Sequence, residues 1–204
     1  MRRIKNATSG TCKSISGSLL VIGMLMVASS LGFSRDRNET IEASAMGTGT
    51  QLGQVIGVTL NIYEFSTPAD RVQLLQAFEK GQNQGLVTAL SKMKAVGHVE
   101  ITGTLGFDCS FIKMTPTSTG RRIIFATNRQ IRFGEAWTDS QTMSFNLTAG
   151  QIDIDDTDKS KSTGALFPAA QLIIDKEGQP QLDLNQNAWK LVDIIDWRGT
   201  PGVN

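Results

Sequence analysis

Apolar and polar residues alternate with a period of two through most of the chain after Ile41, and this pattern constrains the fold more than any other feature. The run Ile101–Phe111 is the clearest example, and its apolar face consists of Ile101, Leu105, Phe107, Cys109 and Phe111. Alternation of this kind is typical of strands with one core face and one solvent face. Twenty glycines against five prolines fit tight turns between short strands.

The alternation and the turn residues together predict about nine strands. They are expected at Ile41–Met46, Gln54–Phe65, Ile101–Phe111, Arg122–Asn128, Thr142–Leu147, Gln151–Asp155, Gln171–Asp175, Gln181–Leu184 and Lys190–Trp197. Turns are expected at Pro116–Gly120, Ala149–Gly150 and Lys176–Pro180, and a polar loop at Lys159–Gly164. The predicted fold is mainly β (α+β), a single antiparallel β-sandwich or barrel with one inserted helical pair.

The period changes to a helical one at about residues 67–96. Thr67 offers a capping hydroxyl ahead of Pro68, and Asp70 lies in the first turn. The expected apolar stripe of the first helix is Val72, Leu74, Leu75 and Phe78. Gly81 is predicted to end this helix, and a second helix is expected to end near Gly97.

Residues 1–34 resemble a secretory signal peptide in composition. A basic region, Met1–Lys13, precedes the ten-residue apolar run Leu19–Ala28, and small residues follow. That run is half of the roughly 20 residues that a membrane-spanning helix needs, although an uncleaved anchor remains the alternative. The prediction is an exported protein, periplasmic or extracellular, with a single β-rich domain over residues 35–204 that meets the membrane only transiently through its signal peptide.

Charge and cysteine content narrow the function further. The signal segment holds four of the 20 basic residues and no acidic one, so the remainder has 16 basic against 19 acidic side chains, a net charge of −3. A mildly acidic domain without a basic stripe is a poor candidate for binding nucleic acid. Cys109 is the one cysteine after the signal segment, so no internal disulfide is expected.

Asp153, Asp155 and Asp158 are weak candidates for metal ligands, in the run IDIDDTDKS. Calcium prefers several carboxylate oxygens at alternating positions. The run lacks the glycine and the glutamate that an EF-hand loop needs at its sixth and twelfth positions. A solvated strand end and turn is therefore the preferred interpretation, and no metal and no cofactor are predicted.

Candidate catalytic residues are few. His98 is the single histidine, which excludes a zinc site of several histidines and leaves a spatial triad possible, but the chain has no Gly-x-Ser-x-Gly motif. Cys109 shares an apolar face with two phenylalanines, so we expect an inert core thiol. No catalytic residue is predicted.

Arginines and tryptophans offer possible recognition groups. Arg121, Arg122, Arg129 and Arg132 lie near Trp137 in the sequence and could bind an anion or stack on aromatic rings. The alternative is that Arg122 and its neighbours form the solvent face of a sheet. Trp189 and Trp197 bracket an apolar run and are expected in the core.

Part of the chain resembles a family of uncharacterised exported bacterial proteins. The resemblance rests on TPADRVQLLQAFEKGQNQGLVTALSKMKAVGHVEITG, on GRRIIFATNRQIRFGEAW and on IDIDDTDKSKSTG, and covers roughly Thr67 to Asp175. In that family a similar helical pair precedes a strand, and an Arg-Arg-Ile strand leads to a short acidic turn. The resemblance implies a bacterial exported protein and carries no activity with it.

These observations favour a non-enzymatic exported binding or interaction domain, with a small apolar ligand or an envelope protein as its partner. Small exported barrels often hold one ligand, although fold alone does not give function. One alternative is a hydrolase-like enzyme that uses scattered carboxylates such as Asp108 and Glu100. Another is a structural cell-envelope protein that acts through its edge strands.

Overall fold

The computed structural model describes residues 38–131, 145–175, 178 and 180–198 of the 204-residue chain. The chain divides into two compact units, Met1–Phe33 and Ser34–Asn204, and every described residue belongs to the second. The predicted signal segment therefore lies outside the described residues. Within the described part, no helix combines the length and the apolar character that crossing a membrane requires.

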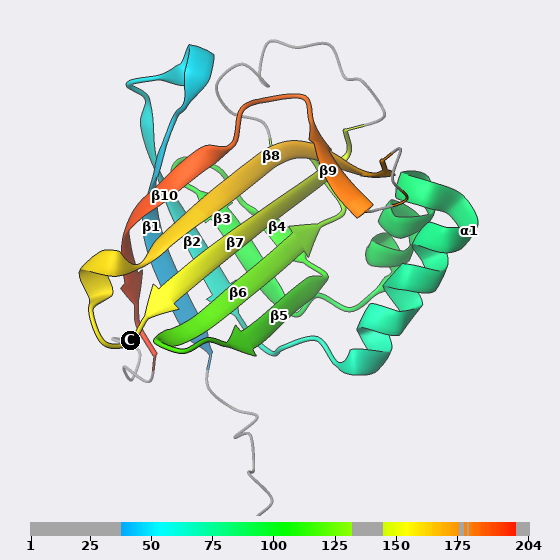
Figure 1. Cartoon of the computed structure of the whole chain (residues 1–204), viewed down its shortest axis with the longest axis horizontal. Helices are drawn as coiled ribbons and strands as arrows, with labels where there is room; N and C mark the ends of the chain where they lie inside the picture. The colour runs from blue at the N-terminus through cyan, green and yellow to red at the C-terminus, as the bar shows by residue number, and fades with distance from the viewer. Residues whose placement is uncertain (1–37, 132–144, 176–177, 179, 199–204) are drawn as a thin grey trace, which may run out of the picture. The chain divides into compact units, whose positions relative to one another are not determined.

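Ten antiparallel strands form one nearly closed, barrel-like sheet, which confirms the predicted antiparallel β architecture (Figure 1). The strands are β1 (Glu39–Met46), β2 (Val55–Ile62), β3 (Gly97–Ile101), β4 (Phe107–Cys109), β5 (Phe111–Pro116), β6 (Gly120–Thr127), β7 (Leu147–Asp155), β8 (Thr163–Ile174), β9 (Pro180–Leu184) and β10 (Trp189–Asp196). Their order around the sheet is β4-β3-β2-β1-β10-β8-β7-β6-β5, and β9 pairs with the far end of β8. Two 3-10 turns, η1 (Gly49–Gln51) and η3 (Lys159–Lys161), connect strands.

The sheet comes close to closing because its two end strands are consecutive in the chain. Only Ser110 separates β4, which pairs with β3, from β5, which pairs with β6. One bent segment therefore borders both ends of the sheet. Beside the bend, the Ile112 N–H donates to the Ser66 hydroxyl at 3.0 Å, and the Ile112 carbonyl accepts from the Ser66 N–H at 2.7 Å. These hydrogen bonds satisfy backbone groups that have no partner within the sheet.

Apolar side chains fill the interior of the barrel. Alternate residues of each strand point inward, as Ile41, Ala43 and Ala45 do on β1. The largest interior side chains are less than 2% exposed, and they include Ile41, Leu60, Ile112, Ile123, Phe125, Ile131, Leu166, Trp189 and Leu191. Burying each such side chain contributes about 1.5–3 kcal/mol, so this core is the main source of stability.

A β-bulge in β10 changes which of its side chains face the interior. Glu42 pairs with Ile195 and Ser44 pairs with Val192, so two residues of β10 stand against one of β1. Asp193, within the bulge, has a positive φ of 51°. As a result Ile194 is buried and Ile195 is 47% exposed, the reverse of what uninterrupted alternation from Leu191 predicts.

The helical element α1 (Pro68–Lys92) lies beside the sheet at the end where β5 and β9 are seen in Figure 1. Thr67 caps the helix ahead of Pro68, as predicted, and Asp70 in the first turn completes a capping box with it. Gln82, with φ 51° and ψ −148°, interrupts the helix one residue after the predicted stop at Gly81, so the expected pair is one helix with a break.

The break in α1 is also where the helix attaches to the sheet. The Asn83 side-chain oxygen accepts from the Leu172 N–H on β8 at 2.9 Å, and its amide donates to the Asn146 side chain at 2.9 Å. Leu74 and Phe78 are buried, as the apolar stripe predicts. The prediction is wrong for the other two residues of the stripe, Val72 and Leu75, whose side chains are 51% and 49% exposed.

The predicted single strand Ile101–Phe111 is wrong. The chain turns after Ile101 and returns as β4, so this stretch forms the end of a β3–β4 hairpin. Gly103 and Gly106 adopt positive φ values of 85° and 72° in the turn, and Leu105 at its tip is 97% exposed. The period of two continued by chance across a turn that the glycines make possible.

The predicted turn at Ala149–Gly150 is also wrong, because both residues lie inside β7. A Cβ on Gly150 would come within 2.2 Å of the Phe125 ring, so this glycine makes room for a core side chain. β8 begins at Thr163, well before the predicted Gln171. The first half of the predicted strand Thr142–Leu147 lies outside the described residues, and its last residue begins β7.

Candidate binding pocket

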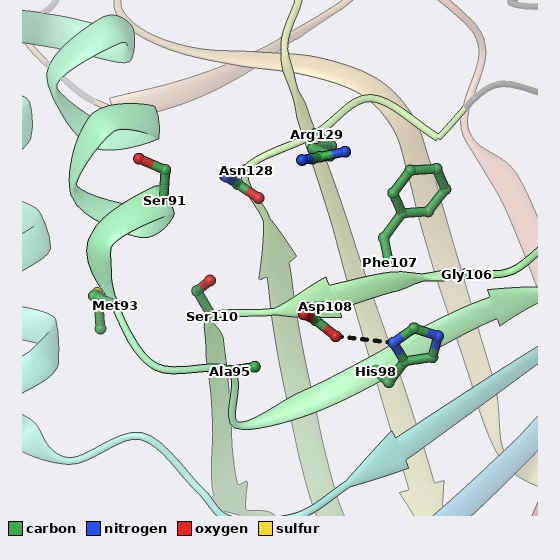
Figure 2. Close-up of a pocket in the computed structure, with 10 residues that line it drawn as sticks. All are labelled: Ser91, Met93, Ala95, His98, Gly106, Phe107, Asp108, Ser110, Asn128 and Arg129. Atoms are coloured by element: carbon green, nitrogen blue, oxygen red, sulfur yellow. Dashed lines mark hydrogen bonds and ion pairs between the residues drawn. The ribbon is translucent and has the colours of Figure 1, made fainter.

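A pocket of about 420 Å³ lies between the end of α1, the β3–β4 hairpin and the segment that follows β6 (Figure 2). Its lining residues are Ser91, Met93, Ala95, His98, Gly106, Phe107, Asp108, Ser110, Asn128 and Arg129. This volume is at the lower end of the range of about 300–1,000 Å³ that is usual for sites of small ligands. The site thus has room for a small molecule on the flank of the barrel.

His98 and Asp108 form one wall of the pocket, from directly opposed positions on β3 and β4. The His98 Nδ1 lies 3.1 Å from the Asp108 Oδ1, and its Nε2 lies 3.0 Å from the Leu105 carbonyl oxygen. Each ring nitrogen therefore already faces an oxygen atom of the hairpin. The ring thus joins the strands to the turn, and neither nitrogen is left for a substrate.

Gly106 allows the His98 ring to lie close to the hairpin backbone. A Cβ at this position would come within 2.3 Å of the His98 Nε2 and 2.6 Å of the Val99 carbonyl oxygen. The positive φ of Gly106 adds a second reason for glycine. The wall of the pocket therefore depends on a residue without a side chain.

Ser110, Asn128 and Arg129 supply the polar groups of the pocket that have no partner in the described part of the chain. Within the described residues, none of these three side chains makes a hydrogen bond or an ion pair. Ser110 is only 5% exposed, whereas Asn128 is half-buried and Arg129 is exposed. Figure 2 shows Ser110 and Asn128 beside the space between α1 and β4, with Arg129 at its rim.

The backbone that carries Asn128 and Arg129 is held in place by Thr127. The buried Thr127 hydroxyl donates to the Arg129 carbonyl at 2.7 Å and accepts from the Arg129 N–H at 3.2 Å. Ile131 continues this anchoring, because its N–H reaches the Thr148 hydroxyl at 2.8 Å. The two side chains thus project from a fixed segment, as a preformed site requires.

The three aspartates considered as metal ligands lie elsewhere and have local partners. Asp153 on β7 pairs with Arg122, and the Asp155 Oδ1 accepts from the Thr157 hydroxyl and the Asp158 N–H. Asp158 in turn accepts from Ser160. Across the described part of the chain, no group of three His, Cys, Asp or Glu side chains is placed to hold a metal ion.

Hydrogen bonds lower the pKa values of these aspartates. Burial opposes this effect at Asp153, but hydrogen bonds from Arg122 and Gln151 outweigh it and lower the pKa. Hydrogen bonds from Thr157 and Asp158 lower the pKa of Asp155 to about 2. Hydrogen bonds from Ser160 and Lys161 likewise lower the pKa of Asp158. Each carboxylate is thus stabilised in its charged form by partners on its own turn or on the same or the neighbouring strand.

Cys109 and the strand arginines are distributed over different environments. Cys109 is fully buried, and burial followed by the charge of Asp108 raises its pKa to about 12, as expected for an inert core thiol. Arg121 points into the barrel and Arg122 points out to Asp153. Of the four arginines considered for anion binding, Arg129 lines the pocket, and Arg132 lies outside the described residues, as does Trp137.

The tryptophan prediction is half right. Trp189 is 1% exposed and belongs to the core, but Trp197 follows the end of β10 and is 44% exposed.

The two carboxylates of the hydrolase hypothesis, Asp108 and Glu100, do not lie in the same site. Asp108 lines the pocket, whereas Glu100 is exposed further along β3 and is not among the lining residues.

The sequence pattern did not single out Ser110 or Asn128. Each stands at the end of a strand, where a polar residue is common and carries no special signal. The bend between β4 and β5, which orients Ser110, was not predicted because the alternation of apolar and polar residues continues across it.

Comparison of the chain with protein-family models, with curated proteins and with solved structures finds no match.

Proposed function

We propose that this chain is a non-enzymatic, exported binding protein and that the pocket beside β4 holds a small polar ligand. One observation carries the proposal: three side chains that have no partner among the described residues, those of Ser110, Asn128 and Arg129, line the same pocket. A ligand in the pocket could form hydrogen bonds with all three side chains.

The chemistry of the pocket favours a polar ligand over the apolar one first considered. The barrel interior, where an apolar ligand would be expected, is packed with side chains such as Phe125, Leu166 and Trp189, each 1% exposed or less. The pocket lies outside that core, and polar groups make up most of its lining. A ligand that forms hydrogen bonds is the better match to such a surface.

Binding is also favoured over catalysis by the engagement of His98. A general base needs a ring nitrogen within reach of the proton that it abstracts. Both nitrogens of His98 already face acceptors, Asp108 and the Leu105 carbonyl. A hydrolase that uses Asp108 and Glu100 has less support, because Glu100 is not part of the pocket.

Export is part of the proposal and rests on the N-terminal sequence. The basic and apolar regions before residue 35 have the order and length of a signal peptide. The destination would be the periplasm or the extracellular space, where a domain without disulfides relies on its apolar core for stability. The same sequence argument makes an envelope protein or a small molecule the expected partner and disfavours nucleic acid.

The test is a native mass spectrum of the mature protein recovered after export from its own host. We expect a polypeptide that starts between Leu31 and Arg35 and that carries a small polar molecule. A Ser110→Leu variant should lose that molecule, because the new side chain removes the hydroxyl and occupies the pocket. A Ser118→Leu variant, changed in the exposed β5–β6 turn, should retain it.

Two outcomes would contradict the proposal. A bare wild-type polypeptide would reject binding and shift support to a structural role in the envelope. A molecule that survives in Ser110→Leu would place binding elsewhere on the protein. A mass that starts at Met1 would reject cleavage of the signal peptide and leave the binding result unaffected.

A further inference from the structure

One charge that lines the pocket has no partner of opposite sign among the described residues. Three lining residues can carry charge: His98, Asp108 and Arg129. His98 and Asp108 contact each other within the hairpin wall, where the His98 Nδ1 lies 3.1 Å from the Asp108 Oδ1. Arg129 has no carboxylate partner among the described residues.

The unpartnered groups are mainly hydrogen-bond donors. Arg129 presents five N–H groups and no acceptor, Asn128 presents an amide NH₂, and Ser110 presents a hydroxyl. A guanidinium can bind both oxygens of one acid group through two parallel hydrogen bonds. An oxyanion therefore complements this set better than a neutral hydroxyl group does.

The remaining lining limits the size and character of the ligand. Met93, Ala95 and Phe107 add short apolar surfaces beside the donors. A volume of about 420 Å³ suits a compact organic molecule and excludes a folded partner from the pocket itself. The ligand should thus combine a small carbon skeleton with one acid group.

We infer that the pocket takes a small organic acid whose carboxylate or phosphate group lies against Arg129, Asn128 and Ser110. This inference rests on the proposed binding function and adds the ligand class to it. Arg129 is the group that distinguishes an acid from its neutral counterpart, because it supplies the charge. Ser110 and Asn128 add hydrogen bonds that both kinds of ligand can use.

Isothermal titration calorimetry at low ionic strength tests the inference with matched probes. The panel compares glucuronate and glucose 6-phosphate with glucose, lactate with lactamide, and benzoate with benzamide. We expect at least one acid to bind about tenfold or more tightly than its neutral counterpart, since a charge-assisted hydrogen bond is roughly twice as strong as a neutral one. The two hexose acids separate a carboxylate from a phosphate as the preferred group.

The matched variants are Arg129→Gln and Arg122→Gln. Arg129→Gln should abolish the preference for the acid and leave binding of the neutral counterpart largely unchanged. Arg122→Gln removes an exposed arginine that pairs with Asp153 and does not line the pocket, so it should keep the wild-type preference. Circular dichroism spectra of both variants check that the fold is retained.

Three results would overturn the inference: acids and neutral counterparts that bind alike, a preference that survives in Arg129→Gln, or no binding by any acid in the panel. These results are distinguishable from failure of the proposed function. A neutral polar molecule found by native mass spectrometry would uphold binding and reject the acid. A bare polypeptide together with an inactive panel would reject both.

Discussion

Arg121 on β6 and Glu39 on β1 lie 82 positions apart in the chain and form a bidentate ion pair inside the barrel, between strands that are not neighbours in the sheet. Asp196 on β10 accepts a third hydrogen bond from Arg121 at 2.7 Å. The three side chains are no more than 12% exposed. Burial opposes the charge of Arg121, but hydrogen bonds and charges from Glu39 and Asp196 outweigh it and raise its pKa.

Replacing Arg121 should destabilise the protein strongly. Arg121→Met leaves Glu39 buried without its cation and leaves Asp196 with only its contact to the more exposed Arg198. Breaking a buried pair in this way costs about 3–5 kcal/mol. Urea denaturation of Arg121→Met and Arg122→Met measures the difference between inward and outward positions on one strand. Arg122→Met should remain close to wild type, because its pair with Asp153 is at the surface. Equal losses from the two variants would contradict the inward placement of Arg121.

The β3–β4 hairpin should respond differently to alanine at its two glycines. Gly103→Ala introduces a Cβ into open space and should cost about 1–2 kcal/mol for its left-handed backbone alone. Gly106→Ala should cost more, because its Cβ also collides with the His98 ring and the Val99 carbonyl. Thermal denaturation of both variants gives the difference, and adding His98→Ala to Gly106→Ala should recover part of it. Equal losses at the two glycines would refute the close contact.

The break in α1 should become more stable when Gln82 is replaced by glycine. The backbone of Gln82 lies in a region that costs a side-chain-bearing residue about 1–3 kcal/mol and that glycine adopts freely. Gln82→Gly should therefore raise the free energy of unfolding. Gln76→Gly, at an exposed position inside the first half of α1, should lower it by about 1 kcal/mol. A loss of stability in both variants would indicate that residue 82 is ordinary helix.

The thiol of Cys109 should not react in the folded protein. Cys109 is fully buried, and its pKa of about 12 leaves almost no thiolate at pH 8. Labelling with a chromogenic disulfide reagent should therefore require unfolding and proceed rapidly in concentrated urea. Rapid labelling without denaturant would show that the segment around Ser110 opens and would undermine the rigid pocket proposed above.

Asp155 should contribute to stability at neutral pH and lose that contribution in acid. Its pKa falls from 3.8 to about 2 because Thr157 and Asp158 donate hydrogen bonds to its carboxylate. The pKa is lower in the folded protein than in the unfolded chain, so the ionised carboxylate stabilises the folded state at pH values above the unfolded pKa. This contribution disappears as the pH drops from about 4 to about 2. A carboxyl NMR titration measures the pKa. Thr157→Val should raise it, and an unchanged pKa in this variant would exclude the hydroxyl as a cause.

Local patterns were sufficient to predict much of the architecture. The capping sequence Thr67–Asp70 predicts the start of α1, and alternation predicts most strands and the buried position of Cys109. These features depend on backbone geometry and on neighbouring residues, so the sequence carries them directly. The wrong predictions, a strand across Gly103 and a turn at Gly150, came from glycines whose roles depend on distant side chains or on the path of the chain.

The candidate site was much less predictable than the fold. Arg129 was one of four arginines with the same apparent standing, and Ser110 resembled any polar residue on a strand. The site forms because three separate segments within residues 91–129, which end near Met93, Ser110 and Arg129, meet at one flank of the barrel. Only the closure of the sheet and the attachment of α1 at Asn83 bring these segments together.

What the sequence determined by itself was therefore the class of the protein: an antiparallel β fold with one helical insertion and a thiol hidden in its core. The tertiary structure decided which polar groups meet. The two adjacent arginines Arg121 and Arg122 face opposite sides of one strand, and a bulge at Asp193 turns Asp196 toward the first of them. The physical reason is the sequence separation over which the interactions act. Local backbone preferences act over a few residues, whereas a pocket or an interior ion pair requires the entire sheet to fold.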